Sequence, residues 1–203
     1  MKPIILDNVL PISFIDKLVN TFTDINLDWH YNNNISIPNN QKLELESYVH
    51  NDNNIVETEA FVHRLLANCE NEEFLQSNYY DIVYPIFYFL QEKIKLNKVL
   101  RARAVLAIKN VQLQSKYNVP HVDFFKPHIS IIVYLSDTDG GTILFKDKYI
   151  RGVSDTSKKK IEQVIEAKKG RILIFDGLQF HTGQIPSTKN KLILNINIEG
   201  EII

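Results

Sequence analysis

The stretch RILIFDGLQFHTGQIPSTKNKLILNINI, residues 171–198, decides the fold, because it holds two β-type runs with polar residues between them. The first run, residues 171–175, ends at an Asp-Gly pair that is typical of a tight turn. In the second run, residues 191–198, alternate side chains are aliphatic, and the others are Lys191, Ile193, Asn195 and Asn197. Such a strand fits the wall of a barrel whose polar side lines a cavity.

Further β-type runs occur in residues 99–114, 128–136 and 142–145. In the first of these runs, Ala102, Ala104, Leu106 and Ile108 share one face, and Arg101, Arg103, Val105 and Ala107 share the other. We expect a tight turn at Asp139-Gly140-Gly141. Many short strands in series, without crossover helices, predict an antiparallel barrel or a jelly roll.

The first half of the chain is predicted to be helical and to support the sheet. A helix is expected to start at Pro11 and to carry apolar residues at helical spacing as far as Phe22. Residues 58–67 place Phe61, Leu65 and Leu66 on one face. Residues 74–96 are the longest helix candidate, kinked or split at Pro85, with aromatic side chains that we interpret as core packed against the sheet.

Three segments are interpreted as surface or packing elements. Residues 27–36 are expected to form a strand, in which Trp29 and His30 serve packing, and residues 37–54 form a long loop. Residues 146–168 are too long for a simple turn. They form either a lid whose Tyr149 and Arg151 contact a substrate, or a surface excursion with a short helix.

Composition narrows the class of protein. The chain has 203 residues, 44% of them hydrophobic, which fits one domain with a sizeable core. Its formal charge of −1 gives no basic excess for a nucleic-acid partner, and we interpret Lys158-Lys159-Lys160 as the solvated side of a short helix.

The fold class that we predict is α+β with a mainly β core. Residues 1–98 form a helical support region and residues 99–203 form the β core, in one compact domain overall.

The expected location is a reducing cytoplasm. Cys69 is the only cysteine, so no intrachain disulfide is possible. Asp7 and Pro11 interrupt the apolar stretch that a signal peptide would need, and no apolar run is long enough for a membrane span. The abundance of Asn, Ile and Lys hints at an AT-rich coding genome, bacterial or phage.

His121, Asp123 and His181 form a candidate metal site. The two residues of an H-x-D pair project from the same side of an extended strand, and His181 returns from a later strand. Two histidines and one carboxylate cap one face of a metal and leave the other open, which is the ligand pattern of non-haem iron(II) oxygenases. H-x-D is nevertheless a common tripeptide, and lone histidines are usually surface or core residues. His128 competes as a third histidine, and we expect it in a loop or beside the ligands.

Lys191 is a candidate anchor for a co-substrate. An oxygenase with three protein ligands needs electrons beyond those in Fe(II), and 2-oxoglutarate is a common source. Its distal carboxylate needs a buried cation, and Lys191 lies ten residues after His181 on a largely polar strand face that also carries Asn195. Tyr134 can donate a second hydrogen bond to that carboxylate. The alternatives are a solvated lysine at a strand edge and a core tyrosine.

Residues from about 106 to 199 resemble the Fe(II)/2-oxoglutarate dioxygenases, and most of all their prolyl 4-hydroxylase branch. The matching residues are Tyr117, Pro120-His121-Val122-Asp123-Phe124, Val133-Tyr134-Leu135-Ser136, Gly140-Gly141, Phe145, Lys168-Lys169-Gly170-Arg171, Phe175, His181 and Asn190-Lys191. The resemblance implies a double-stranded β-helix (jelly-roll) core with supporting N-terminal helices. It assigns iron to His121, Asp123 and His181, and it assigns 2-oxoglutarate to Lys191 with help from Tyr134. Asn195 is placed with them among the cofactor-binding residues.

Three departures from the family pattern concern individual residues. The spacing from Tyr117 to His121 is one residue longer than usual. Thr142 follows the glycine pair directly, one position earlier than the family threonine, so its side chain is expected to face the other way. No tryptophan follows Lys191. The resemblance covers less than half of the chain and says little about residues 1–98.

The implied function is hydroxylation of an unactivated C–H bond, with release of succinate and CO2. The resemblance suggests a residue of a peptide or protein, such as proline, as the substrate. The implied cofactors are Fe(II), 2-oxoglutarate and O2, with ascorbate as an optional addition. The alternatives are a hydroxylase of a free amino acid or other small molecule, and a jelly-roll module that binds metal without catalysis. Arg101 and Arg103 either favour an acidic substrate or pair with neighbouring carboxylates, and the oligomeric state is left open.

Overall fold

The computed structural model describes residues 2–36, 53–69, 73–151 and 159–203. Its strands are β1 (Ile4–Leu6), β2 (His30–Asn32), β3 (Ala60–Ala67), β4 (Leu75–Gln76), β5 (Ile94–Ala107), β6 (Ile129–Tyr134), β7 (Thr138–Lys148), β8 (Ile161–Ala167), β9 (Ile172–Asp176), β10 (Gln179–Gly183) and β11 (Lys191–Ile202). The helices are α1 (Ile12–Phe22), α3 (Tyr80–Val83), α4 (Ile86–Leu90) and a 3₁₀ turn at Val111–Leu113. None of the helices in these ranges is long and apolar enough to cross a membrane.

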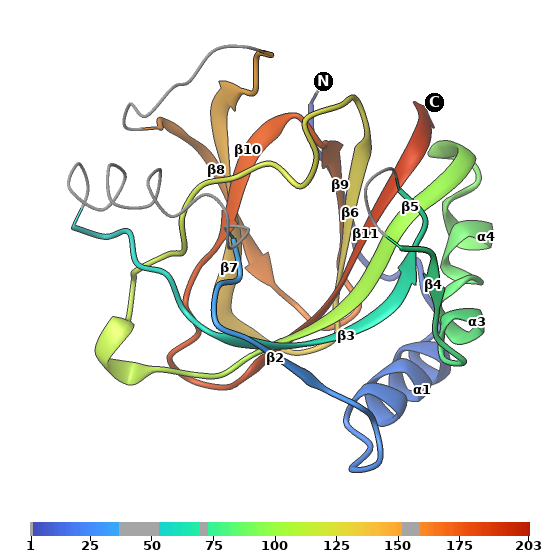
Figure 1. Cartoon of the computed structure of the whole chain (residues 1–203), viewed down its shortest axis with the longest axis horizontal. Coiled ribbons are helices and arrows are strands. Elements are labelled where there is room, and N and C mark those ends of the chain that lie inside the picture. The colour runs from blue at the N-terminus through green and yellow to red at the C-terminus, as the bar shows by residue number, and fades with distance from the viewer. Residues whose placement is uncertain (1, 37–52, 70–72, 152–158) are drawn as a thin grey trace.

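The strands form two antiparallel sheets. In the larger sheet the strand order is β1-β9-β6-β11-β5-β3-β2, and β4 pairs with β3 at its side. The smaller sheet has the order β10-β7-β8. The smaller sheet lies on one side of the larger sheet and the helices lie on the other (Figure 1). The double-stranded β-helix that was expected is confirmed.

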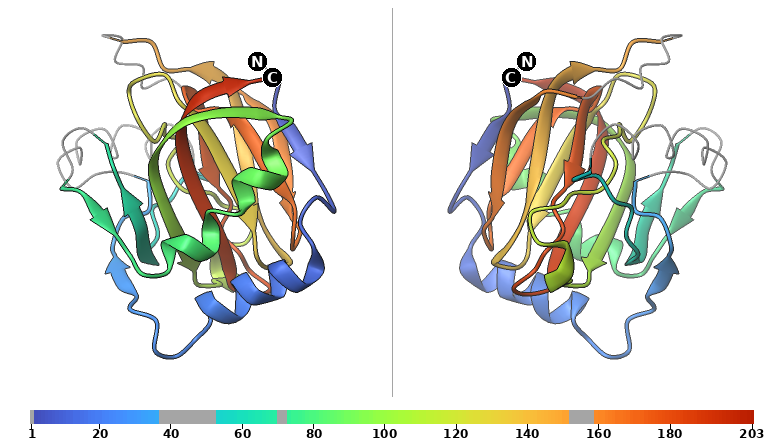
Figure 2. Two further views of the ribbon diagram at one scale, coloured as in Figure 1. Left: turned by 90° about the vertical axis from the view of Figure 1, so that its right-hand side faces the viewer. Right: turned by 90° about the vertical axis from the view of Figure 1, so that its left-hand side faces the viewer.

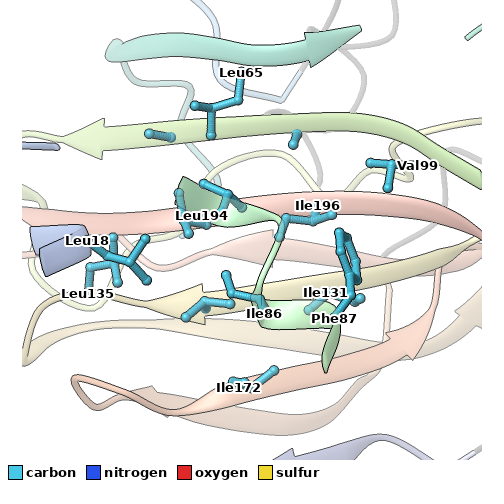
Figure 3. Close-up of a cluster of buried hydrophobic side chains, with 14 of the residues drawn as sticks. Leu18, Leu65, Ile86, Phe87, Val99, Ile131, Leu135, Ile172, Leu194 and Ile196 are labelled. Atoms are coloured by element: carbon cyan, nitrogen blue, oxygen red, sulfur yellow. The ribbon is translucent and has the colours of Figure 1, made fainter. Parts of the chain in front are cut away.

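The outer face of the larger sheet carries the main hydrophobic core. Aliphatic side chains at alternate positions of β6, β9 and β11 point to this face, and α1, α3 and α4 cover it (Figure 2). Figure 3 shows part of this cluster, including Leu18, Leu65, Ile86, Phe87, Val99, Ile131, Leu135, Ile172, Leu194 and Ile196. Because strand side chains alternate, packing this face directs the polar residues of β5 and β11 inwards, between the two sheets.

Several secondary-structure predictions are confirmed. The helix after Pro11 is α1, and its apolar residues Ile15, Leu18 and Phe22 are buried. The runs at 128–136, 171–175 and 191–198 are the strands β6, β9 and β11.

The helical prediction for residues 58–67 is wrong. They form β3, which pairs with β5 along almost its whole length, so its backbone hydrogen bonds go to a distant strand. An apolar run of this length does not distinguish a strand from a helix, and the pairing decides between them.

The prediction of one long helix at 74–96 is also wrong, although Pro85 does separate two short helices, α3 and α4. Leu75 and Gln76 pair with β3, two short helices follow, and β5 starts at Ile94. The aromatic residues are only partly core: Tyr80 and Phe87 are buried, but most of the others are exposed.

Around the smaller sheet, two further predictions are corrected. Asp139-Gly140-Gly141 is part of β7, not a turn, and the Asp139 carboxylate accepts hydrogen bonds from the backbone and the hydroxyls of Ser187 and Thr188. Residues 161–167 are β8, not a short helix, and Lys159, which was expected on a solvated side, is buried with its ammonium 4.4 Å from the centre of the Phe180 ring.

Parts of three predictions fall on residues that are not described. The loop predicted at 37–54 lies almost wholly outside the described residues, and so do Lys158 and the middle of the lid predicted at 146–168. The division of the chain at residue 98 stays a prediction, although β2, β3 and β4 precede that residue and belong to the larger sheet.

Candidate metal centre and co-substrate cavity

The backbone brings His121 and His181 together. His181 lies in β10, and His121 lies in the segment that leads to β6. The two residues form a small antiparallel bridge, in which each backbone N–H donates to the other residue's carbonyl at 2.9 Å. Their imidazole rings are 4.7 Å apart between centroids. His121 and His181, which are sixty residues apart in the sequence, are therefore in direct backbone contact.

Asp123 completes the group. The candidate ligand atoms of His121, Asp123 and His181 all lie within 4.8 Å of one another. Asp123 Oδ2 is 3.6 Å from His181 Nε2, a distance too long for a hydrogen bond but suitable for two ligands of one ion. The structure thus brings together the three residues that the sequence predicted as metal ligands.

Both histidines present Nε2 to the site. Nδ1 of His121 donates to the Val119 carbonyl at 3.0 Å, and Nδ1 of His181 donates to the Gln179 carbonyl at 3.2 Å. A carbonyl can only accept, so Nδ1 carries the proton and the Nε2 lone pair is free for a metal. Nε2 of His181 is buried and has no hydrogen-bond partner among the described residues. Burial and the neighbouring His181 lower the pKa of His121 to about 3, so its imidazole is neutral.

The two carboxylate oxygens of Asp123 have different partners. Oδ1 accepts from Arg101 Nη2 at 2.6 Å and lies 3.3 Å from Arg103 Nη2, whereas Oδ2 accepts from Asn197 Nδ2 at 2.9 Å. The Asp123 side chain is 1% exposed. Burial acts to raise its pKa, but the two guanidiniums and His181 outweigh burial and hold the pKa well below the usual range. Asp123 is therefore an anion fixed in orientation, and the expected pairing of Arg101 and Arg103 with a carboxylate is confirmed.

A narrow cavity of about 60 Å³ runs between the sheets from this group. One end is lined by Arg103, His121, His181 and Asn195, and the other by Thr142, Gly183 and Lys191. Along the strand pairing, the apolar side chains of Val105 and Ile193 lie between the two ends, and Ile132 lies opposite Asn195. The cavity thus connects the candidate metal ligands to the predicted anchor for a co-substrate.

Lys191 is buried at the far end of this cavity. Its side chain is 5% exposed, and its ammonium group donates to the Gly141 carbonyl at 2.8 Å. Burial lowers the pKa of Lys191 to about 7. A side chain on Gly183 would approach the ammonium nitrogen to 3.1 Å, so this glycine keeps the space beside the cation open. An ammonium group that is buried without a carboxylate is the group that would benefit most from an anionic ligand.

Thr142 faces the cavity, which corrects the expectation that its side chain would face the other way. Thr142 lies directly opposite Gly183 in the pairing of β7 with β10, and directly opposite residues share a face. The Tyr134 hydroxyl donates to Thr142 Oγ1 at 2.6 Å. The threonine hydroxyl can then donate its own hydrogen onwards, so Tyr134 reaches the cavity through Thr142.

The remaining residues that were named from the sequence lie beside the cavity, in packed positions or at the surface. Asn195 lines the cavity 3.4 Å from Asp123 Oδ2, and its own Oδ1 is buried without a partner in the described ranges. His128 is buried against Phe124 and is outside the three-ligand group, as expected. Tyr117 packs against Phe145 and does not line the cavity. Trp29 packs on the core, but His30 is exposed, so the packing role predicted for it is wrong.

Sequence reasoning missed the groups that orient the ligands. The carbonyls of Val119 and Gln179 carry no sequence signal, because every residue has a carbonyl. Asn197 was placed on the correct face of its strand, and its position two residues beyond Asn195 is the signal that could have predicted its contact with Asp123.

The depressed pKa of Lys191 predicts how stability depends on pH in the protein without co-substrate. Between the folded pKa of about 7 and the ordinary value of 10.5, the unfolded chain holds a proton that the folded protein has released. The free energy of unfolding should therefore rise with pH across this window, by at most about 1.4 kcal/mol per pH unit. Urea unfolding of the wild type and of Lys191→Met at pH 7, 8, 9 and 10 checks this, and parallel curves for the two proteins would contradict it.

No protein-family model matches the chain, and no curated protein matches it in sequence. Solved structures do match. An oxidoreductase of the 2OG-Fe(II) oxygenase family from Burkholderia pseudomallei has a TM-score of 0.61 at 8% identity, over 96% of this chain and 84% of that one. A prolyl-4-hydroxylase from Pseudomonas putida has a TM-score of 0.57 at 12% identity, over 97% and 92%.

A third similar structure is a prolyl hydroxylase from Trichoplax adhaerens, in complex with a peptide fragment of the hypoxia inducible factor oxygen degradation domain. It has a TM-score of 0.56 at 10% identity, over 97% of this chain and 82% of that one. At these identities the likeness establishes the fold. The chain has the double-stranded β-helix of the 2OG-Fe(II) oxygenases, and the resemblance to them and to their prolyl hydroxylases is confirmed at that level.

Proposed function

We propose that this protein is an Fe(II)- and 2-oxoglutarate-dependent dioxygenase that hydroxylates an unactivated C–H bond and releases succinate and CO2. The observation that carries the proposal is the shared cavity. At one end, two histidines and a carboxylate converge with free Nε2 atoms, and at the other end a buried lysine has no carboxylate partner among the described residues. One end could therefore hold the metal, and the other end could hold the distal carboxylate of 2-oxoglutarate.

His121, Asp123 and His181 would hold the metal. Their donor set of two imidazoles and one carboxylate suits non-haem Fe(II) and leaves positions open for other ligands. When bound, Fe(II) and 2-oxoglutarate supply the oxidising power for the reaction with O2. The backbone carbonyls of Val119 and Gln179 keep both Nε2 atoms turned into the site, so the site would need little rearrangement to bind a metal.

Lys191 and Thr142 would bind the distal carboxylate of 2-oxoglutarate. The lysine supplies the positive charge, and the threonine supplies a hydroxyl donor that is oriented by Tyr134. The apolar wall between them and the metal ligands excludes water from the middle of the cavity, which protects the reaction from wasteful side reactions. Asn195, beside Asp123, would contact the co-substrate near the metal.

The substrate that we propose is a residue of a peptide or protein, such as proline. The support is the fold likeness to prolyl hydroxylases, of which the one from Trichoplax adhaerens was solved with a peptide. A panel of proline-containing peptides, compared with free amino acids, tests this part of the proposal by mass spectrometry, since hydroxylation adds one oxygen atom. Hydroxylation of free amino acids alone would contradict the peptide assignment.

The reaction itself is tested by succinate formation. The purified protein should convert 2-oxoglutarate to succinate in air when Fe(II) is added, slowly without a substrate and faster with one. NMR spectroscopy of the mixture follows both compounds. Iron binding without oxygen-dependent consumption of 2-oxoglutarate would overturn the proposal and favour a metal-binding module.

A further inference from the structure

Positive charge occurs at both ends of the inner sheet face. Along the pairing of β11 with β5, Lys191 lies opposite Ala107, whereas Asn195 and Asn197 lie opposite Arg103 and Arg101. At about 3.4 Å per residue, Arg101 lies some 20 Å along the strand from the position opposite Lys191. The metal ligands lie near the arginines. With the proposed function, the co-substrate would occupy the cavity on the lysine side of the metal ligands, and the arginine side is the side left for the substrate.

Arg101 is held in place by three contacts. Its Nη2 donates to Asp123 Oδ1 at 2.6 Å, its Nε donates to Asn197 Oδ1 at 3.2 Å, and its guanidinium lies 4.6 Å from the centre of the Phe124 ring. Its Nη1 makes no hydrogen bond to any residue in the described part of the chain. The side chain is 16% exposed, so this end is partly open. Arg101 is thus preorganised and keeps donors available in a fork that matches a carboxylate or a phosphate.

Two guanidinium groups lie at the carboxylate of Asp123. Nη2 of Arg101 and Nη2 of Arg103 both approach Oδ1, at 2.6 and 3.3 Å, so positive charge is concentrated beside this oxygen. A divalent metal held by His121, Asp123 and His181 would add to this positive charge.

A third arginine continues this charge outwards. Arg64 in β3 lies directly opposite Arg103 in β5, so the two residues share a face of the sheet, and Arg64 is exposed. A row of like charges that leads to a site attracts an oppositely charged ligand and speeds its arrival.

We infer that Arg101 and Arg103 form an anion site for the substrate, and that the substrate carries a carboxylate or a phosphate close to the C–H bond that is oxidised. This inference rests on the proposed function and names the substrate class for it. Arg101 donates to the anion through the Nη1 end, and Arg103 adds charge from the cavity wall. The same two arginines position Asp123, so the anion would bind next to the residues that would hold the metal.

Binding of small blocked peptides tests the anion site without turnover. The protein is loaded with Zn(II) and 2-oxoglutarate under argon and titrated calorimetrically with Ac-Asp-Pro-NH2, Ac-Pro-Asp-NH2 and their Asn counterparts. These four peptides form the carboxylate set. Ac-phosphoSer-Pro-NH2, its Ser counterpart and inorganic phosphate form the phosphate set. We expect the acidic probes of either the carboxylate set or the phosphate set to bind at least about tenfold more tightly than their neutral counterparts, because a hydrogen bond to a charged group is stronger than one to a neutral group.

Variants assign the preference to the arginines. Arg101→Gln should remove most of it, and Arg101→Lys, which keeps the charge but loses the fork, should retain part of it. Lys95→Gln is the matched control, because it removes one positive charge from an exposed position of the same strand and should leave the preference unchanged. The zinc content of each variant, measured by atomic absorption, shows whether Asp123 still holds the metal.

The outcomes separate this inference from the proposed function. Equal binding of charged and neutral probes, no saturable binding of any acidic probe, or a preference that survives in Arg101→Gln and Arg103→Gln overturns the anion site, even in a protein that turns over 2-oxoglutarate. An Arg101-dependent preference in a protein that makes no succinate supports the anion site and refutes the dioxygenase assignment.

Discussion

Replacing Asp123 with alanine is expected to abolish iron-dependent succinate formation and to weaken metal binding at least about a hundredfold. Losing a group that only orients a ligand already costs about 10–100-fold in metal affinity, and Asp123 is a candidate ligand itself. The substitution also leaves Arg101 and Arg103 without their shared carboxylate. Two histidines beside two guanidinium groups that have lost this carboxylate should bind a divalent ion only weakly. Manganese titration followed by electron paramagnetic resonance measures the affinity, and succinate release measures the activity.

The control for this variant is Asp24→Ala, which removes an exposed aspartate whose carboxylate, within the described part of the chain, accepts hydrogen bonds from Asn26 alone. It should bind manganese and form succinate as the wild type does. Asp123→Asn keeps the shape of the side chain and separates loss of the ligand from loss of packing, and circular dichroism confirms folding. Succinate formation at the wild-type rate by Asp123→Ala would remove this residue from the metal site.

Replacing Lys191 with methionine should raise the KM for 2-oxoglutarate by roughly a hundredfold or more, with little change in metal affinity. Methionine fills a similar volume but cannot pair with a carboxylate, and removing one partner of a buried ion pair costs about 3–5 kcal/mol. The Lys191 ammonium donates its hydrogen bond to the Gly141 carbonyl and not to a candidate metal ligand, so the three ligands should be undisturbed. Without co-substrate the variant should be at least as stable as the wild type below pH 7, because no unpaired cation is buried.

Lys189→Met is the matched control, since Lys189 is an exposed lysine two residues earlier in the same segment. Its KM for 2-oxoglutarate should not change. Calorimetric titration of 2-oxoglutarate into the zinc-loaded proteins gives Kd directly and does not depend on turnover. An unchanged Kd in Lys191→Met would mean that the co-substrate carboxylate binds elsewhere, and loss of metal binding would mean that the lysine has a structural role.

Local patterns predicted the parts of the site that each strand carries by itself. The alternation in residues 191–198 placed Lys191 and Asn195 on one face and the aliphatic residues on the other, and both faces are as expected. The H-x-D pair and the distant His181 were identified by residue type and spacing. These inferences hold because the direction of a strand side chain is set by period-two geometry, which depends only on the residue's own strand.

Contacts between distant segments were not predictable in the same way. Residues 58–67 and 161–167 became strands because β5 and β7 supply partners for their backbone groups. Thr142 turns into the cavity because of its register opposite Gly183. The Asp-Gly-Gly segment, whose composition is typical of a turn, instead lets Pro186 approach the backbone closely.

By itself, the sequence determined which residues can hold a metal and which face of each strand they occupy. Only the tertiary structure decided that His121 and His181 share a backbone bridge, that Lys191 closes the same cavity, and that two arginines hold Asp123. The physical reason is that residue chemistry and strand alternation are local, whereas strand pairing and register minimise the free energy of the whole chain. A charge network that spans β5, β11 and the segment before β6 exists only after those strands have paired.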